Sequence, residues 1–230
     1  MIDAPLFQDR TEAGEKLAAL IQAELMQHPV DATCNKIVYA LPRGGLPVAS
    51  PIANALSCPL TVLVSKKITH PNNPELAVGA VTASGEVLWM QQKTFSFRPE
   101  RWREQAMETA IDKAKSLESQ FLPFCPEVNH EGAILILVDD GIATGMTIAV
   151  AVKALAKLAP AQIWLVAPLA PPVMIPWLQE WCDSILRDSK INYRVIVLAT
   201  PEQFVSVSSF YSKFPQVATS EALEYLKVKS

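Results

Sequence analysis

The chain has 230 residues, of which half are apolar, and its formal net charge is -3. This length and composition suit one globular domain with a well-buried core, and the acidic balance gives no support for a general nucleic-acid binder, which needs a basic surface. No apolar run approaches the ~20 residues of a membrane span, and residues 1–8 lack the basic and apolar regions of a signal peptide. We therefore expect a soluble cytoplasmic protein that spans no membrane.

Helix and strand patterns alternate in the first half of the chain. An amphipathic pattern predicts a helix over about 11–26, and an apolar run that ends in Pro-Arg-Gly-Gly predicts a strand over 36–41. A second helix is expected over 47–56 and a second strand over 60–65. Two β-rich runs around the turn Ala83-Ser84-Gly85-Glu86 predict a hairpin over 77–90.

The second half continues the alternation with helices over about 99–121, 146–158 and 176–185 and strands over 133–138, 163–167 and 195–198. The strand over 133–138 is apolar throughout, which suits a central parallel strand covered on both faces. The order predicts an α/β fold with a parallel sheet between helices, in a single domain with a core over about 33–200. The stretches 1–30 and 201–230 lie outside the alternation, and we expect them to form a hood or flap over that core.

The segment Leu135–Thr147, which reads LILVDDGIATGMT, carries the chemistry. Two carboxylates, Asp139 and Asp140, follow the most apolar strand at its carboxyl end, where parallel sheets bind ligands, and could accept hydrogen bonds from vicinal hydroxyls. Small residues then lead into a helix, so the backbone N–H groups from Ala143 to Thr147 could converge on a phosphate. The alternative is a strand followed by an ordinary Asp-Gly turn, in which the two acids only cap.

A second candidate anion site follows the strand over 36–41. Arg43 stands beside Gly44 and Gly45, so that backbone N–H groups and one guanidinium could surround a pyrophosphate. Alone, this motif is also compatible with an ordinary turn that carries a surface arginine. Lys66 and Lys67, after the next strand, could neutralise the same anion or could simply be solvated.

The run LPRGGLPVA…KKI…NPELAVGAV…LVDDGIATGMT resembles the type I phosphoribosyltransferases, over nearly the full chain. The resemblance implies a Rossmann-like core with a small hood, and phosphoribosyl pyrophosphate (PRPP) as substrate. Asp139 and Asp140 would then hold the ribose hydroxyls. The other roles fall to two sets of residues: Ala143, Thr144, Gly145, Met146 and Thr147 for the 5-phosphate, and Arg43, Gly44, Gly45, Lys66 and Lys67 for the pyrophosphate.

The resemblance also implies a reaction: transfer of the 5-phosphoribosyl group to a nitrogenous acceptor with release of pyrophosphate. Mg²⁺ would be bound through PRPP oxygens, with no direct protein ligand. Arg43 would stabilise the leaving group, and residues 70–76 would form a closing loop. A homodimer is a further expectation of the family. Ala143 stands where the 6-oxopurine enzymes of the family usually carry Asp, which argues against a hypoxanthine or guanine acceptor and leaves the acceptor unnamed.

Two other functions remain open at this level. The chain could be a regulatory protein that binds PRPP without turnover, although Arg43 and the lysines favour catalysis. It could also be an unrelated phosphosugar enzyme, although it shows no GxSxG or HExxH motif. One further set of residues is ambiguous between stacking on a nucleobase and filling a core or an oligomer contact: Trp177, Trp181, Phe204, Phe210 and Tyr211.

The chain has four cysteines, and none of them forms a CxxC pair: Cys34, Cys58, Cys125 and Cys182. The histidines show no metal-ligand spacing either. We expect buried free thiols in a reducing compartment.

Overall fold

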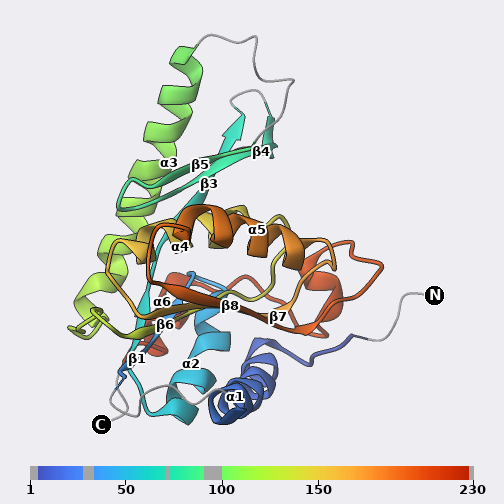
Figure 1. The fold of residues 1–230 in the computed structure, drawn as a ribbon. Helices are drawn as coiled ribbons and strands as arrows, with labels where there is room; N and C mark the ends of the chain where they lie inside the picture. Colours follow the sequence, from blue (N-terminus) through green and yellow to red (C-terminus); the bar gives the residue numbers. More distant parts are fainter. Residues whose placement is uncertain (1–4, 28–33, 71–72, 91–99, 228–230) are drawn as a thin grey trace.

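The computed structural model describes residues 5–27, 34–70, 73–90 and 100–227. Its main sheet has five parallel strands in the order β2-β1-β6-β7-β8 (Figure 1). These strands are β1 (Lys36–Ala40), β2 (Leu60–Val62), β6 (Ile134–Val138), β7 (Gln162–Leu169) and β8 (Asn192–Ala199). The α/β fold with a parallel sheet is therefore confirmed. The apolar run over 133–138 is its central strand, and every residue of β6 is buried.

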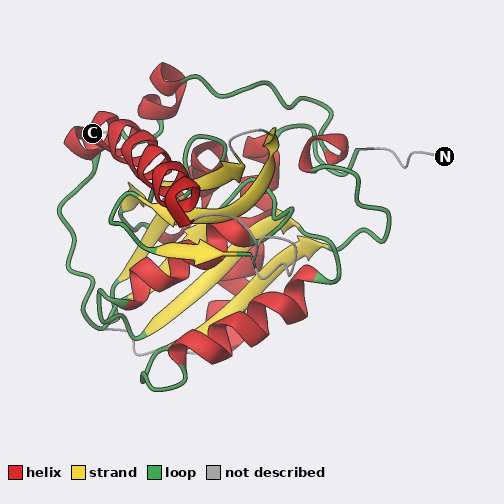
Figure 2. Ribbon diagram, turned by 90° about the horizontal axis from the view of Figure 1, so that it is seen from above, coloured by secondary structure: helices red, strands yellow, loops and turns green. Residues whose placement is uncertain are grey.

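Helices cover both faces of this sheet, because its strand residues alternate between two cores. On one face, Val38 and Ile136 pack with Leu17 and Ile21 of α1 (Arg10–Gln27) and with α2 (Gly45–Leu56). On the other face, residues such as Leu135 pack against α4 (Met146–Ala156) and α5 (Met174–Leu186). Figure 2 shows the strands with these helices around them. The N-terminal stretch thus contributes a helix that covers the sheet.

A second, antiparallel sheet stands above the first and carries α3 (Glu100–Phe121) on one side (Figure 1). Its strands are β3 (Ser65–His70), β4 (Asn73–Thr82) and β5 (Val87–Trp89), so the predicted hairpin over 77–90 is confirmed. The single strand expected over 60–65 divides, because the chain leaves the parallel sheet after Val62 and enters the antiparallel sheet at Ser65. Residues 71–72 of the expected closing loop lie outside the described residues.

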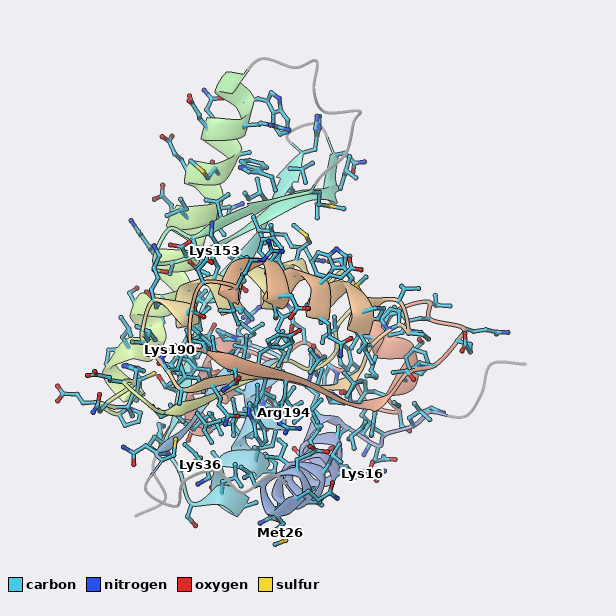
Figure 3. The ribbon with its side chains drawn as sticks, in the orientation of Figure 1. Lys16, Met26, Lys36, Lys153, Lys190 and Arg194 are labelled. Carbon is cyan, nitrogen blue, oxygen red and sulfur yellow. The ribbon has the colours of Figure 1, made fainter. Side chains whose placement is uncertain are left out.

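An ionic contact joins the small sheet to the core. Lys153 of α4 donates to the Val87 carbonyl at 3.2 Å and lies 3.5 Å from Glu86, which also pairs with Lys157. Lys153 accordingly points from α4 toward the small sheet (Figure 3). The hairpin turn is therefore tied to the helix that follows the candidate phosphate loop.

The terminal segments pair with each other. The Leu6 and Phe7 amides donate to the Phe210 carbonyl, and the Ser212 amide donates to the Phe7 carbonyl at 2.8 Å. The nearby elements are η3 (Val207–Phe210) and α6 (Thr219–Glu224). Of the ambiguous aromatics, Phe204, Phe210 and Tyr211 pack in the small apolar cluster formed here.

No helix in the described ranges is both long enough and apolar enough to cross a membrane. The four cysteines are free thiols, but only Cys182 is buried; Cys34, Cys58 and Cys125 are partly exposed. Burial raises the pKa of the Cys58 thiol to about 11 and that of Cys182 to about 12.

Candidate functional site

The acid pair lies at the carboxyl end of β6, where the backbone leaves the sheet. The Asp139 amide still donates to the Val166 carbonyl at 3.2 Å, so the strand pairing reaches the first acid. The Asp140 amide donates to Asp139 Oδ1 at 2.9 Å, which fixes the two carboxylates relative to each other. Both acids are only partly buried, so they stay open to a ligand at the edge of the sheet.

The loop after the acid pair forms a small pocket of about 180 Å³. Its backbone turns at Gly145, which has a φ of 69°, in the left-handed region that favours glycine. In the part of the chain that the structure describes, the amides from Ala143 to Thr147 donate no backbone hydrogen bond, as expected at the start of a helix without a side-chain cap. The pocket lining comprises Lys67, Asp139, Gly141, Ile142, Ala143, Thr144, Gly145, Thr147, Ile148 and Val207. Met146 is buried, so it offers its backbone only.

The loop from Ala143 to Thr147 packs against tryptophan side chains of α5. A Cβ at Gly145 would lie 2.7 Å from the Trp177 ring, and Trp177 stacks with Trp181 at a centroid distance of 6.5 Å. Trp181 donates from Nε1 to the Ala149 carbonyl of α4. These two tryptophans of α5 therefore support the loop from behind. They also line a cavity of about 640 Å³ that shares Ala143 and Thr144 with the pocket.

The glycine-rich turn after β1 packs directly against the acid pair. A Cβ at Gly44 would overlap Asp140 Oδ2, and a Cβ at Gly45 would lie 2.7 Å from the Val138 carbonyl. The Gly45 amide donates to the Leu41 carbonyl at 3.0 Å, so it is engaged within the turn. Arg43 donates from Nη1 to Thr219 Oγ1 at 3.3 Å. The two candidate anion loops therefore meet at one edge of the sheet.

The two lysines of β3 have different surroundings, because successive strand residues point to opposite faces. Lys67 is exposed and lines the small pocket beside Asp139. Lys66 is partly buried, and burial together with repulsion from Arg43 and Lys113 lowers its pKa. Within the described ranges, no ion pair is formed by any of the four cations just named, Arg43, Lys66, Lys67 and Lys113. The edge of the site thus carries positive charge that is not paired with a carboxylate among the described residues.

The surroundings of the acid pair disfavour its negative charge. Burial, and then the neighbouring Asp140 carboxylate, raise the pKa of Asp139 well above its usual value, against the opposing effect of Lys67 and Arg10. Burial also raises the pKa of Asp140, and the hydrogen bond and charge of Arg10 oppose this shift. Such a site favours ligands that donate hydrogen bonds, as a vicinal diol does.

The structure adds two residues that the motifs did not indicate. Arg10, at the start of α1, donates from Nε to Asp140 Oδ2 at 2.8 Å. Tyr211 donates its hydroxyl to the Asp140 carbonyl at 2.7 Å. An arginine in the first turn of a helix is disfavoured by the helix dipole, which was the only sequence signal that Arg10 has a partner elsewhere.

Comparison with known proteins places the chain in a family. Residues 8–202 match the model of the phosphoribosyl transferase domain. Two curated proteins from Mycobacterium tuberculosis, of strains CDC 1551 and H37Rv, bear provisional phosphoribosyl transferase names and are each 31% identical over 226 residues. The match covers 96% of this chain but 46% of each relative, so the chain spans about half the length of the curated relatives it matches. The crystal structure of TT1426 from Thermus thermophilus superposes with a TM-score of 0.69 at 27% identity, over 96% of this chain and 97% of that one.

Proposed function

The chain belongs to the phosphoribosyl transferase domain family, and from this membership we propose that it transfers the 5-phosphoribosyl group of PRPP to a nitrogenous acceptor and releases pyrophosphate. One observation carries the proposal. The acid pair Asp139–Asp140, the loop from Ala143 to Thr147 and the turn at Arg43–Gly45 meet at the carboxyl edge of the sheet. A molecule with a phosphate, a vicinal diol and a pyrophosphate would find a matching group at each position.

The 5-phosphate would bind the unpaired amides of the loop and the Thr147 hydroxyl. The helix dipole of α4 adds partial positive charge at that point, and Gly145 adopts the left-handed conformation where the loop enters this helix. Lys67 lies on the same pocket and would add a full charge. The ribose hydroxyls would donate to Asp139 and Asp140, which orients the sugar ring between the two anion loops.

The pyrophosphate would leave toward the positive edge formed by Arg43 and Lys66. As the bond to C1 breaks, negative charge grows on the leaving group, and cations that are not already paired stabilise it most strongly. Gly44 and Gly45 contribute by lacking side chains, because a Cβ at either position would collide with the acid pair or with β6. The acceptor nitrogen would attack C1 from the opposite face, with inversion, while the acid pair faces the developing positive charge of the ring.

Magnesium fits this site as an ion carried by the substrate. Among the described residues, no cluster of three or more acidic, histidine or cysteine side chains could hold a metal ion, and Arg10 already occupies one oxygen of Asp140. Mg²⁺ prefers substrate phosphates and waters to an all-protein cage. An ion that enters with the substrate would neutralise charge on the leaving group, beside Arg43 and Lys66.

The activity is tested by incubating the protein with PRPP, Mg²⁺ and a panel of nitrogenous bases and amines, and by measuring released pyrophosphate. We expect release above the PRPP-only background with at least one acceptor, and its loss in Asp139→Asn. If PRPP binds but no acceptor in a broad panel raises pyrophosphate release, the transferase proposal fails in favour of a regulator that only binds PRPP.

A further inference from the structure

Arg10 connects the acid pair to both ends of the chain. Its Nε donates to Asp140 Oδ2 at 2.8 Å, and its Nη1 donates to the Pro215 carbonyl at 2.8 Å. The guanidinium also lies over the Phe214 ring, 3.5 Å from its centre, and the side chain is 9% exposed. Two contacts from the segment 214–215 thus hold one buried cation against Asp140. This buried and multiply contacted arginine differs from a surface ion pair, which contributes little to the stability of a protein.

The contact engages one of the two oxygens of the Asp140 carboxylate. Oδ2 is held by Arg10 and lies next to Gly44, and within the described ranges the side-chain contacts of this carboxylate are made at Oδ2. Tyr211 anchors the backbone of the same residue through its carbonyl. Asp140 is therefore held at both its carboxylate and its main chain by groups from the terminal segments, with one oxygen left to accept a hydrogen bond.

We propose that Arg10 is a positioning residue, which holds the Asp140 carboxylate turned so that Oδ1 accepts a ribose hydroxyl. This inference rests on the proposed function for the identity of the ligand. It also assigns a role to the paired terminal segments: they hold the arginine in place. PRPP would then bind well only when these segments are docked.

The charged surroundings of Asp140 support this role. Asp139, just after β6, lies beside Asp140, Lys67 on β3 acts on Asp139, and Tyr211 after η3 donates its hydroxyl to the Asp140 carbonyl. Arg10 on α1 supplies the one direct ionic contact to Asp140 within the described residues. Burial raises the pKa of Asp140, and the hydrogen bond and the charge of Arg10 are the largest effects that oppose this shift. A protonated carboxyl is a poorer acceptor for a ribose hydroxyl.

The test compares four variants of the full chain: Arg10→Gln, Arg10→Lys, Tyr211→Phe and Lys16→Gln. Lys16 lies on the same helix, pairs with Glu12 and lies over the Phe7 ring, 5.3 Å from its centre, so its removal takes one positive charge from the same terminal segments without touching Asp140 (Figure 3). Tyr211→Phe loosens the same anchor without changing charge. Two quantities are measured against pH: the ¹³C titration of the Asp140 carboxyl, assigned with Asp140→Asn, and the Kd of PRPP with Mg²⁺ by calorimetry.

We expect Arg10→Gln to raise the pKa of Asp140 by about one unit or more and to weaken PRPP binding about tenfold near pH 7, since an adjacent opposite charge shifts a carboxyl by roughly 1–3 units. Arg10→Lys should restore part of the PRPP affinity and bring the pKa of Asp140 part of the way back. Lys16→Gln and Tyr211→Phe should leave the pKa of Asp140 unchanged. An unchanged titration in Arg10→Gln, or an equal shift in Tyr211→Phe, would overturn the inference. If wild-type protein binds no PRPP, the proposed function fails, whereas the Asp140 titration still decides what Arg10 does.

Discussion

Gly44 and Asp140 are in direct contact, so that a Cβ at position 44 would overlap the Oδ2 atom of the carboxylate. The two residues belong to loops that follow neighbouring strands, β1 and β6. Their contact joins the expected pyrophosphate turn to the expected ribose acids in one surface. The side chain missing from Gly44 is what lets Asp140 occupy its position.

Gly44→Ala should therefore impair ligand binding more than folding. The added methyl group would push the Asp140 carboxylate away from its place and disturb Arg10, and we expect PRPP affinity to fall about tenfold or more, equivalent to at least about 1.4 kcal/mol. Gly85→Ala is the control, because Gly85 lies in the β4–β5 turn with open space around it. Calorimetry that gives both variants the same affinity would show that the contact does not shape the site.

Gly145→Ala tests the support of the phosphate loop. Gly145 and Gly132 have nearly the same φ, 69° and 68°, but a Cβ at Gly145 meets Trp177 at 2.7 Å whereas a Cβ at Gly132 meets nothing within 4 Å. Both alanine variants should lose about 1 kcal/mol to backbone strain, and Gly145→Ala should lose a further ~1–3 kcal/mol through overpacking. Denaturant unfolding measures the free energy of unfolding of both variants. Equal losses would mean that Trp177 moves aside for the added methyl group without destabilising the protein.

Asp139→Asn should stabilise the folded protein at neutral and alkaline pH. The folded pKa of Asp139 lies above its unfolded value, so its contribution to stability is full below the unfolded pKa and is lost as pH rises through the folded pKa. Removing the charge removes that loss, while an Asn oxygen can still accept from the Asp140 amide. We expect about 1 kcal/mol at pH 8, or roughly 2–4 °C in Tm, with the gain shrinking toward pH 4.

Asp140→Asn provides the contrast for this experiment, because it leaves Arg10 buried without its ionic partner. That variant should be destabilised at pH 8. Thermal melts of both variants at pH 8 and pH 4 check the pair. A Tm for Asp139→Asn below that of the wild type at pH 8 would show that the Asp139 carboxylate stabilises the folded protein, contrary to this prediction.

Lys67→Gln should weaken PRPP binding, since Lys67 lines the pocket of the phosphate loop and is not paired with a described carboxylate. We expect a loss of about fivefold to tenfold that diminishes as ionic strength rises, because exposed charges are screened by salt. Lys190, on the distant turn before β8, gives the control variant Lys190→Gln (Figure 3). Equal salt-dependent affinities in the two variants would remove Lys67 from the site.

The sequence predicted the elements that local patterns specify. The unbroken apolar run of β6 identified the central strand, and the Asp-Asp and small-residue segments after it marked the candidate site, because strand ends and helix starts have local signatures. The division between Val62 and Ser65 was missed: the same β-rich run serves two sheets, and no turn residue separates them.

The contacts of Arg10 and Tyr211 with Asp140 could not be predicted from the sequence, for a different reason. Arg10 and Asp140 are 130 residues apart in the chain, and their contact depends on how the terminal segments pair over the sheet edge. Tyr211 was seen only as an aromatic of uncertain use, whereas its hydroxyl proves to hold the Asp140 backbone. Motifs describe contiguous residues, so partners supplied by tertiary packing escape them.

Calorimetric titration of the wild-type protein with PRPP and Mg²⁺, beside Asp139→Asn/Asp140→Asn, tests the central proposal most directly. We predict a single saturable binding event in the wild type that disappears in the double variant, with circular dichroism confirming that both proteins are folded. Absence of binding in folded wild-type protein, or undiminished binding in the double variant, would contradict the assignment of this edge of the sheet as a PRPP site.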